Sequence, residues 1–250
     1  MAARLTDEHM HTLDEDGFVI VKDFLPAAQC AEMAAAVRRI LPPWDQVRAD
    51  PPANHGAHAY FPYAEPILNR AIVHDEAIAF SQRWLGTDHI HYRPGLAMAT
   101  YPGHPGGEAH IDNGNNSLLP PKHGDRGHAQ IIFWCYLDDV GPDQAPTRMI
   151  PNRFGNDASR AVPFVAPAGS VCIFHNYTWH AASPYTRGDE QRYVWKIAFG
   201  RADHYWEQVH YYTHMGMNEQ FRALVSELTA EQSLLFRFTP PADPYYTEQT

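Results

Sequence analysis

The spacing of apolar residues divides the chain into three stretches. Up to about residue 90, the longest patterned segments carry apolar residues three or four positions apart, which is typical of helices. From Ile90 to Phe199, short apolar and β-branched runs between turn residues indicate strands. Helical spacing returns after residue 218. The pattern predicts helices packed outside antiparallel sheets, within a single domain of residues 1–250.

Capping signals at the ends of the patterned segments give the expected bounds of the helices. Helices are expected from Thr6 to about Asp16, from Pro26 to about Leu41, from about Asp75 to Leu85 before Gly86, from Glu219 to Leu228, and from the capping box Thr229-Ala-Glu-Gln232 onwards. A strand from Phe18 to Val21 separates the first two helices.

Two segments allow more than one interpretation. The stretch from Pro42 to Pro66 is proline-rich and irregular, and it fits a lid or entrance loop as well as a static surface loop. Aromatic residues near the C-terminus either close the mouth of a barrel or seat a helix on the sheet, and the second use is the commoner one. These residues are Tyr205, Trp206, Tyr211 and Tyr212.

The tripeptide His110-Ile-Asp112 is the first candidate for chemistry. In an extended segment, side chains two positions apart point to the same face, so both groups can reach one metal ion. With 16 His in 250 residues such a tripeptide arises easily by chance, and its surroundings therefore matter. A proline- and glycine-rich loop from Tyr101 to Glu108 precedes it, and Asn113 to Asn116 follow it. Functional residues concentrate between such turn-rich segments.

A third ligand is expected far along the chain, where His180 begins a strand after a turn. The preceding strand is predicted from Ser170 to Phe174. His175 is the alternative ligand, but it lies at the end of that first strand and does not easily share a face with His180. We therefore favour His180, whose other interpretation is a half-buried histidine that caps the turn.

Arg192 begins the next predicted strand, after a hydrophilic hairpin. Its planar guanidinium matches a carboxylate through two parallel hydrogen bonds. A position one strand from the metal would let it hold the far carboxylate of a 2-oxo diacid. The spacing alone is equally compatible with a surface arginine paired with Asp189 or Glu190.

Together these residues predict a mononuclear iron site. Two imidazoles and one carboxylate on one face of an octahedral ion leave three positions open, which is the arrangement of non-haem Fe(II) oxygenases. Two open positions can chelate a 2-oxo acid, and the third can take O2.

The chain also resembles a known family over nearly its whole length. Thr6-Asp-Glu-His9 and Asp14 to Leu25 are similar to the opening of the phytanoyl-CoA dioxygenase family, and the later motifs follow in the family's order. The resemblance implies a mainly β fold with flanking helices around a double-stranded β-helix, the jelly roll of cupin-like proteins. It implies that His110, Asp112 and His180 bind Fe(II), that Arg192 binds the C5 carboxylate of 2-oxoglutarate, and that Trp134 lies beside this cosubstrate.

The sequence departs from the family pattern at two points. Many relatives carry a hydroxyl residue two positions beyond the distal histidine, where this chain has Ala182 followed by Ser183, so the cosubstrate contact falls to Ser183. The usual Ile-Pro-Gly-Ser-His reads Ile150-Pro-Asn-Arg-Phe154, and Arg153 then either faces a substrate or is a solvated turn residue, the commoner case.

The resemblance implies an oxidation that converts 2-oxoglutarate to succinate and CO2, with O2 as oxidant and ascorbate as an optional reductant. Asp112 favours hydroxylation of a C–H bond, because halogenating relatives replace this carboxylate with a small residue. Desaturation, epimerisation and cyclisation are alternatives with the same cofactors. Alternatives from other classes are an inactive β-barrel that serves as a binding module and a metal-dependent cupin-like isomerase, which would need no Arg192.

The substrate is expected to be a small metabolite or natural-product intermediate. Tyr101, Arg153 and Trp179 are the candidate substrate contacts, and aromatic residues near the motif strands favour a partly apolar molecule. A formal net charge of -10 argues against nucleic acid or an anionic membrane as partner, and the chain is expected to be a monomer or homodimer.

Cysteine usage and hydropathy bear on the location of the protein. Cys30, Cys135 and Cys172 show no pairing pattern, and two of them lie in predicted core strands, which suits free thiols. No signal-peptide pattern or membrane-length apolar run is present in the sequence. We therefore expect a soluble, cytoplasmic protein.

Overall fold

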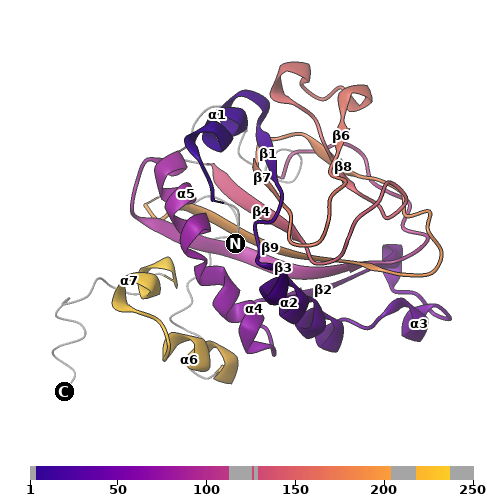
Figure 1. The fold of residues 1–250 in the computed structure, drawn as a ribbon, viewed down its shortest axis with the longest axis horizontal. Helices are drawn as coiled ribbons and strands as arrows, with labels where there is room; N and C mark the ends of the chain where they lie inside the picture. Colours follow the sequence, from indigo (N-terminus) through magenta and orange to yellow (C-terminus); the bar gives the residue numbers. More distant parts are fainter. Residues whose placement is uncertain (1–3, 113–125, 127–128, 204–217, 237–250) are drawn as a thin grey trace.

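The computed structural model describes residues 4–112, 126, 129–203 and 218–236, and it places two antiparallel sheets beside a layer of helices (Figure 1). The larger sheet has six strands in the order β1-β7-β4-β9-β3-β2, and the smaller has three in the order β6-β5-β8. The strands are β1 (Phe18–Val21), β2 (Gly56–Tyr60), β3 (Ile90–Thr100), β4 (Gln130–Tyr136), β5 (Thr147–Met149), β6 (Val162–Pro163), β7 (Val171–His175), β8 (His180–Ala182) and β9 (Arg192–Arg201).

The helices form at the expected positions, with short additions between them. The α-helices are α1 (Asp7–Asp16), α2 (Ala27–Ile40), α3 (Trp44–Val47), α4 (Pro66–Arg70), α5 (Asp75–Leu85), α6 (Glu219–Val225) and α7 (Ala230–Ser233). The 3-10 helices are η1 (Ala53–His55), η2 (Ala71–Val73), η3 (Asn152–Phe154), η4 (Ala158–Arg160) and η6 (Leu234–Phe236). In Figure 1, α2, α4 and α5 lie along one side of the larger sheet, whereas β6 and β8 lie on the other.

The predicted helix ends are confirmed by their capping contacts. The Thr6 hydroxyl accepts from the backbone of His9, and Thr229 forms the expected capping box with Gln232. Helix α5 ends at Gly86, which has the left-handed φ of 69° that glycine adopts most readily. Helix α6 ends at Val225 instead of Leu228, because the chain tightens into a turn there: the N–H groups of Glu227 and Leu228 donate to the carbonyls three residues earlier, at 3.0 and 3.2 Å.

The larger sheet separates two apolar clusters. The first lies between the sheet and the helices, and its largest members include Phe24, Phe80, Phe133, Trp195 and Phe199. The second lies between the two sheets and comprises Phe18, Ile132, Tyr136, Val140, Met149, Phe164, Ala166, Cys172, Phe174, Val194 and Ala198. We call the second cluster the inner core and the sheet surface that bears it the inner face. Alternation along each strand assigns neighbouring residues to opposite clusters.

The stretch from Pro42 to Pro66 is not irregular throughout, which corrects the expectation of a long loop. It contains α3, η1 and the edge strand β2, which pairs with β3 from Gly56 opposite Thr100 to Tyr60 opposite Leu96. Backbone pairing holds this strand, although its side chains are mostly small and only partly buried. The C-terminal aromatic residues, which either close a barrel or seat a helix, lie outside the described residues, as do Asn113 to Asn116; they are Tyr205, Trp206, Tyr211 and Tyr212. Within the described part of the chain, no helix is long and apolar enough to cross a membrane.

Candidate metal and cosubstrate site

The backbone brings the two predicted histidine ligands together. His110 and His180 form an isolated antiparallel bridge, and each backbone N–H donates to the other residue's carbonyl at 2.9 Å. The two imidazole centroids are 4.4 Å apart. The backbone N–H of Asp112 donates to the carbonyl of Asn176 at 3.1 Å, so the turn before β8 also fixes the carboxylate-bearing residue. Segments far apart in sequence thus converge at the start of β8.

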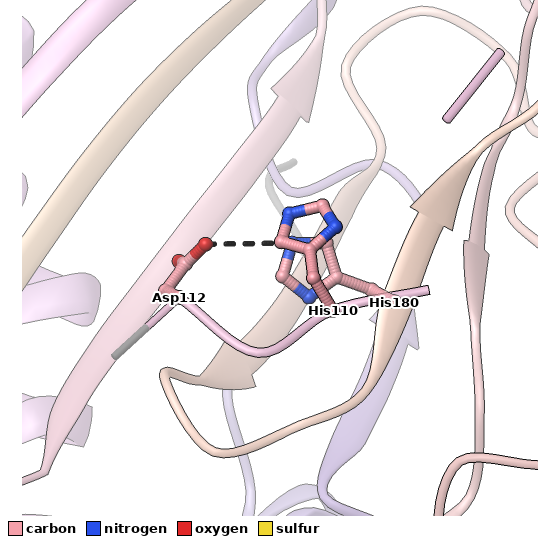
Figure 2. Close-up of side chains that lie close together, drawn as sticks. All are labelled: His110, Asp112 and His180. Atoms are coloured by element: carbon pink, nitrogen blue, oxygen red, sulfur yellow. Dashed lines mark ion pairs between the residues drawn. The ribbon is translucent and has the colours of Figure 1, made fainter. Parts of the chain in front are cut away.

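The side chains of His110, Asp112 and His180 point toward one common space (Figure 2). Each offers one ligand atom, and these atoms all lie within 4.8 Å of one another. The Asp112 Oδ1 atom is 3.5 Å from Nε2 of His180. No other group of three metal-ligating side chains is this close among the residues that the structure describes. The structure therefore brings together the three residues that the sequence predicts as ligands.

Both histidines are held in the orientation that metal binding requires. Nδ1 of His110 lies 3.0 Å from the Glu108 carbonyl oxygen, and Nδ1 of His180 lies 2.9 Å from the Thr178 carbonyl oxygen. A carbonyl only accepts, so in each ring the proton belongs on Nδ1 and the lone pair on Nε2. Such contacts behind the ligands fix the ring and its tautomer at metal sites.

Burial further prepares His180 as a neutral ligand. Its side chain is almost fully buried, and this burial lowers its pKa, while the nearby Asp112 carboxylate opposes the shift. A metal ion competes with protons for imidazole, so a lowered pKa favours metal binding. His110 is exposed and Asp112 is half-buried.

His175 lies outside the cluster, as the favoured interpretation of the sequence expects. It ends β7 on the helix side, where its ring stacks on Trp84 of α5 with centroids 5.7 Å apart. Its Nδ1 lies 3.3 Å from the backbone N–H of Tyr177. The turn between β7 and β8 separates it from His180, which begins β8 as predicted.

Arg192 begins β9 and points into the space between the sheets. It is only 2% exposed, and it donates to the Ala145 carbonyl and, at 2.9 Å, to the Thr100 hydroxyl. Its guanidinium lies over the Tyr136 ring at 5.5 Å, and its Nε has no hydrogen-bond partner among the described residues. A buried cation without a carboxylate is costly, so this position fits an acidic ligand.

Arg192 is not the surface arginine that the sequence allowed as an alternative. The acidic residues of the hairpin pair with Arg187, at 2.7 Å for Asp189 and 3.3 Å for Glu190. This arrangement leaves Arg192 inside the protein.

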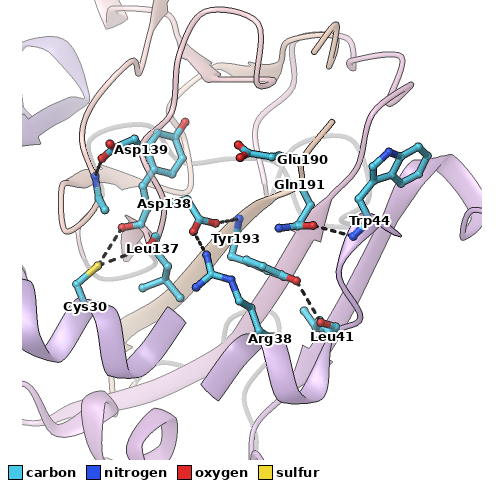
Figure 3. A network of polar contacts seen from close by, with 12 residues as sticks. Cys30, Arg38, Leu41, Trp44, Leu137, Asp138, Asp139, Glu190, Gln191 and Tyr193 are labelled. Carbon is cyan, nitrogen blue, oxygen red and sulfur yellow. Dashed lines mark hydrogen bonds and ion pairs between the residues drawn. The ribbon is translucent and has the colours of Figure 1, made fainter. Parts of the chain in front are cut away.

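Contacts on both sides of Arg192 fix the start of β9 (Figure 3). Before it, the Gln191 side chain accepts from the Trp44 backbone N–H at 2.7 Å. After it, the Tyr193 N–H donates to Asp138 at 2.9 Å, and the same carboxylate pairs with Arg38 of α2. The guanidinium position therefore depends on α2 and α3 as well as on the sheet.

Trp134 and Lys196 lie side by side on the inner face. Trp134 on β4 is directly opposite Lys196 on β9, and its ring packs against the inner core. The Trp134 indole N–H is buried and has no hydrogen-bond partner among the described residues. Lys196 was not among the predicted site residues. It lies four positions after Arg192, and this spacing places both side chains on one face of a strand.

The remaining predicted site residues differ in their placement. Ser183 is buried, and its backbone N–H donates at 3.2 Å to Pro146, next to the Ala145 carbonyl that holds Arg192. Trp179 directly precedes His180 and is half-buried. These two residues lie near the ligands or Arg192 along the chain.

Tyr101 and Arg153 lie elsewhere, and their placement favours structural roles over substrate contacts. Tyr101 is fully buried in the helix-side core, where its hydroxyl donates to the Pro42 carbonyl at 2.6 Å and burial raises its pKa to about 12. Arg153 is exposed, pairs with Asp16 of α1 and lies 4.8 Å from the Phe154 ring centroid. This placement suits a solvated turn residue, the commoner of the two uses considered.

Solved structures with the same fold support this description. The α-ketoglutarate-dependent carbocyclase SnoK from nogalamycin biosynthesis has a TM-score of 0.63 and 14% identity, covering 87% of this chain and 93% of its own. EvdO2 from Micromonospora carbonacea var. aurantiaca, solved with 2-oxoglutarate, has the same TM-score and identity, and the match covers 81% of this chain and 93% of EvdO2. The epimerase SnoN from nogalamycin biosynthesis has a TM-score of 0.61 and 16% identity, and the match covers 78% of this chain and 82% of SnoN. These likenesses confirm the predicted double-stranded β-helix.

Comparison with curated proteins finds no match. The family model of phytanoyl-CoA dioxygenase (PhyH), in contrast, matches residues 13–192, which include every ligand candidate and Arg192. The chain therefore belongs to the phytanoyl-CoA dioxygenase family, as its opening and its motifs predict, and is an enzyme of the Fe(II)- and 2-oxoglutarate-dependent class.

Proposed function

We propose that His110, Asp112 and His180 hold Fe(II) and that Arg192 holds the C5 carboxylate of 2-oxoglutarate. The main support is that three ligand atoms converge within 4.8 Å, while Nδ1 of each imidazole lies against a backbone carbonyl, which leaves Nε2 available as the ligand atom. The buried guanidinium of Arg192 has no carboxylate partner among the described residues, and a diacid would supply one.

When bound, iron with 2-oxoglutarate and O2 supplies the oxidation of a substrate C–H bond, with succinate and CO2 as coproducts. The protein's contribution is placement and exclusion of water. The carbonyls of Glu108 and Thr178 orient the imidazoles, and Phe174 packs 5.1 Å from the His180 ring centroid. Thr100 and Ala145 hold the guanidinium. Trp134 and Ser183 are the proposed further neighbours of the cosubstrate.

The proposed reaction is hydroxylation of a small metabolite or natural-product intermediate. Asp112 favours this outcome because its carboxylate occupies the position that halogenating relatives leave vacant. A second outcome keeps the same cofactors: two structures with this fold are described as an epimerase and a carbocyclase, which supports epimerisation or cyclisation as the alternative. Trp179 is the proposed substrate contact nearest the ligands.

Turnover of 2-oxoglutarate tests the proposal, and isotope labelling separates the outcomes. Candidate substrates that stimulate succinate formation in the wild type, but not in Asp112→Ala, support the iron site. Incorporation of oxygen-18 from O2 into the product indicates hydroxylation, and its absence indicates epimerisation, desaturation or cyclisation. A protein that binds neither iron nor 2-oxoglutarate would instead be an inactive β-barrel. Metal binding without 2-oxoglutarate would indicate a cupin-like isomerase.

We infer that the enzyme acts in the cytoplasm as a monomer or homodimer. All three cysteines are free and buried, which suits a reducing compartment. Size-exclusion chromatography with light scattering gives the oligomeric state directly.

A further inference from the structure

Lys196 is a cation on the inner face for which the proposed function has no role. Along β9, its neighbours two positions away are Val194 and Ala198, and both pack into the inner core. Alternation therefore directs Lys196 into the same space between the sheets. Its cross-strand neighbours are Trp134 on β4 and Leu96 on β3. The lysine lies in the middle of the inner face, between an indole ring and a leucine.

The ammonium group of Lys196 has no acidic partner in the described part of the chain. No hydrogen bond or ion pair joins its Nζ to a described residue, and the side chain is only half-buried. Lysines are seldom placed toward a protein interior unless they are paired, because the charge loses hydration there. Acidic residues outnumber lysines and arginines by 29 to 19, so acidic partners for a cation are plentiful. An inward-facing cation without such a partner is therefore unusual in this protein.

Lys196 lies close to the candidate metal ligands. Phe174, which contacts the His180 ring, pairs with Ile132, two positions from Trp134 on β4. On the inner face, the cross-strand pair of Trp134 and Lys196 is therefore directly adjacent to the pair of Ile132 and Phe174, which packs against His180.

Lys196 and Arg192 lie four positions apart on one strand, roughly 13 Å at the strand rise of about 3.3 Å per residue. Arg192 lies at the end of the sheet beside Thr100, where the proposed 2-oxoglutarate carboxylate binds. The two cations therefore face different parts of the same space. Each can serve a separate anion.

We propose that Lys196 recognises an anionic group of the substrate and holds it beside the iron, with Trp134 supplying an apolar surface next to it. This inference rests on the proposed function, because it assigns a second anion to the site that Fe(II) and 2-oxoglutarate occupy. The substrate class is a small, partly apolar molecule that bears a carboxylate or a similar anion. The anion could instead come from 2-oxoglutarate itself, and the effect of Lys196→Met on cosubstrate affinity separates the two sources.

The experiment uses protein loaded with Zn(II) in place of Fe(II), together with saturating 2-oxoglutarate. Ligand-observed saturation-transfer NMR compares phenylacetate with phenylacetamide, and hexanoate with hexanamide, as matched charged and neutral probes. The wild type is expected to bind the acids about tenfold or more tightly than the amides. Lys196→Met removes this preference, whereas Lys196→Arg keeps it. Lys22→Met is the matched control, because Lys22 is exposed on the surface, and this variant keeps the preference.

A second titration measures 2-oxoglutarate affinity in the same variants, from the visible band of the anaerobic Fe(II) complex. Lys196→Met is expected to change this affinity by less than about threefold. A loss of tenfold or more would assign Lys196 to the cosubstrate and overturn the proposal. A wild-type protein without preference for the acids overturns it as well, whether both probes bind or neither does. Absence of the band in the wild type contradicts the iron and 2-oxoglutarate assignment instead, so the two failures are distinguishable.

Discussion

The main chains of His110 and His180 pair through two hydrogen bonds of 2.9 Å, so backbone pairing sets the two imidazoles side by side. These bonds do not depend on the side chains. A variant that loses one imidazole therefore keeps the local fold, and its effect on metal binding can be measured apart from its effect on stability.

His110→Ala should leave the metal-free protein nearly as stable as the wild type. His110 is exposed, and substitutions at exposed positions usually change the free energy of unfolding by less than about 0.5 kcal/mol. Metal that binds only the folded state stabilises it, so Zn(II) should raise the melting temperature of the wild type and not of this variant. Thermal unfolding with and without Zn(II) measures both effects. His11→Ala, on the exposed face of α1, should keep the metal-induced shift.

Arg192→Ala should raise the 2-oxoglutarate requirement on the order of a hundredfold or more. Removing one partner of a buried, charge-assisted pair costs about 2 to 5 kcal/mol. Iron affinity should stay near the wild-type value, because the guanidinium does not contact the ligand cluster. Arg192→Lys should recover only part of the loss, since an ammonium lacks the planar fork. Titration of 2-oxoglutarate against initial succinate formation gives these values.

The control for this prediction is Arg187→Ala. Arg187 pairs with Asp189 and Glu190 in the surface hairpin, and exposed ion pairs contribute about 0 to 1 kcal/mol. Its replacement should change the 2-oxoglutarate requirement by less than about threefold. Equal requirements in the wild type and Arg192→Ala would remove the cosubstrate assignment.

Thr100→Val should weaken 2-oxoglutarate binding moderately. The Thr100 hydroxyl accepts from the Arg192 guanidinium at 2.9 Å, and valine has the same shape without the acceptor. A hydrogen bond to a charged group contributes about 1.5 to 3 kcal/mol, and the bond to Ala145 remains to orient the guanidinium. We therefore expect a loss of about tenfold. An unchanged affinity would show that Thr100 does not help to position Arg192.

Gly169→Ala should destabilise the fold by about 1 to 3 kcal/mol. Gly169 precedes β7 with a φ of 83°, and an added Cβ would lie 2.9 Å from the Leu25 carbonyl oxygen. Gly188→Ala is the matched control, because no atom of the described residues beyond its own chain neighbours lies within 4 Å of the added Cβ there. Urea unfolding measures both variants, and equal midpoints for the two would contradict the strain at Gly169.

Local signals in the sequence predicted the elements that depend on local contacts. As expected, Thr6 caps the start of α1, Gly86 follows the last residue of α5, and β8 begins at His180 directly after a turn. These features need only a few neighbouring residues. The ligand residues were recognisable for a similar reason, since the spacing of His110 and Asp112 already defines one face of an extended segment.

Features that depend on residues far apart in the chain were harder to predict from the sequence. Strand β2 is held by its pairing with β3, and its own alternation of small side chains gives a weak signal. Tyr101 was expected at the substrate, yet it faces the helix-side core while its neighbour Thr100 contacts Arg192. A shift of one residue along a strand changes the face, and the register was not known from the sequence. The sequence places Lys196 on the same face of the strand as Arg192. Only the packing of Val194 and Ala198 into the inner core shows that this face points into the space between the sheets.

We expect this chain to bind Fe(II) and 2-oxoglutarate together through His110, Asp112, His180 and Arg192. Anaerobic addition of Fe(II) and 2-oxoglutarate to the metal-free protein, followed by visible absorption, tests it most directly. The wild type and His175→Ala should both give the weak charge-transfer band of the chelate, and His110→Ala, Asp112→Ala and His180→Ala should not. Loss of the band in His175→Ala together with its retention in His180→Ala would show that His175, and not His180, is the distal ligand.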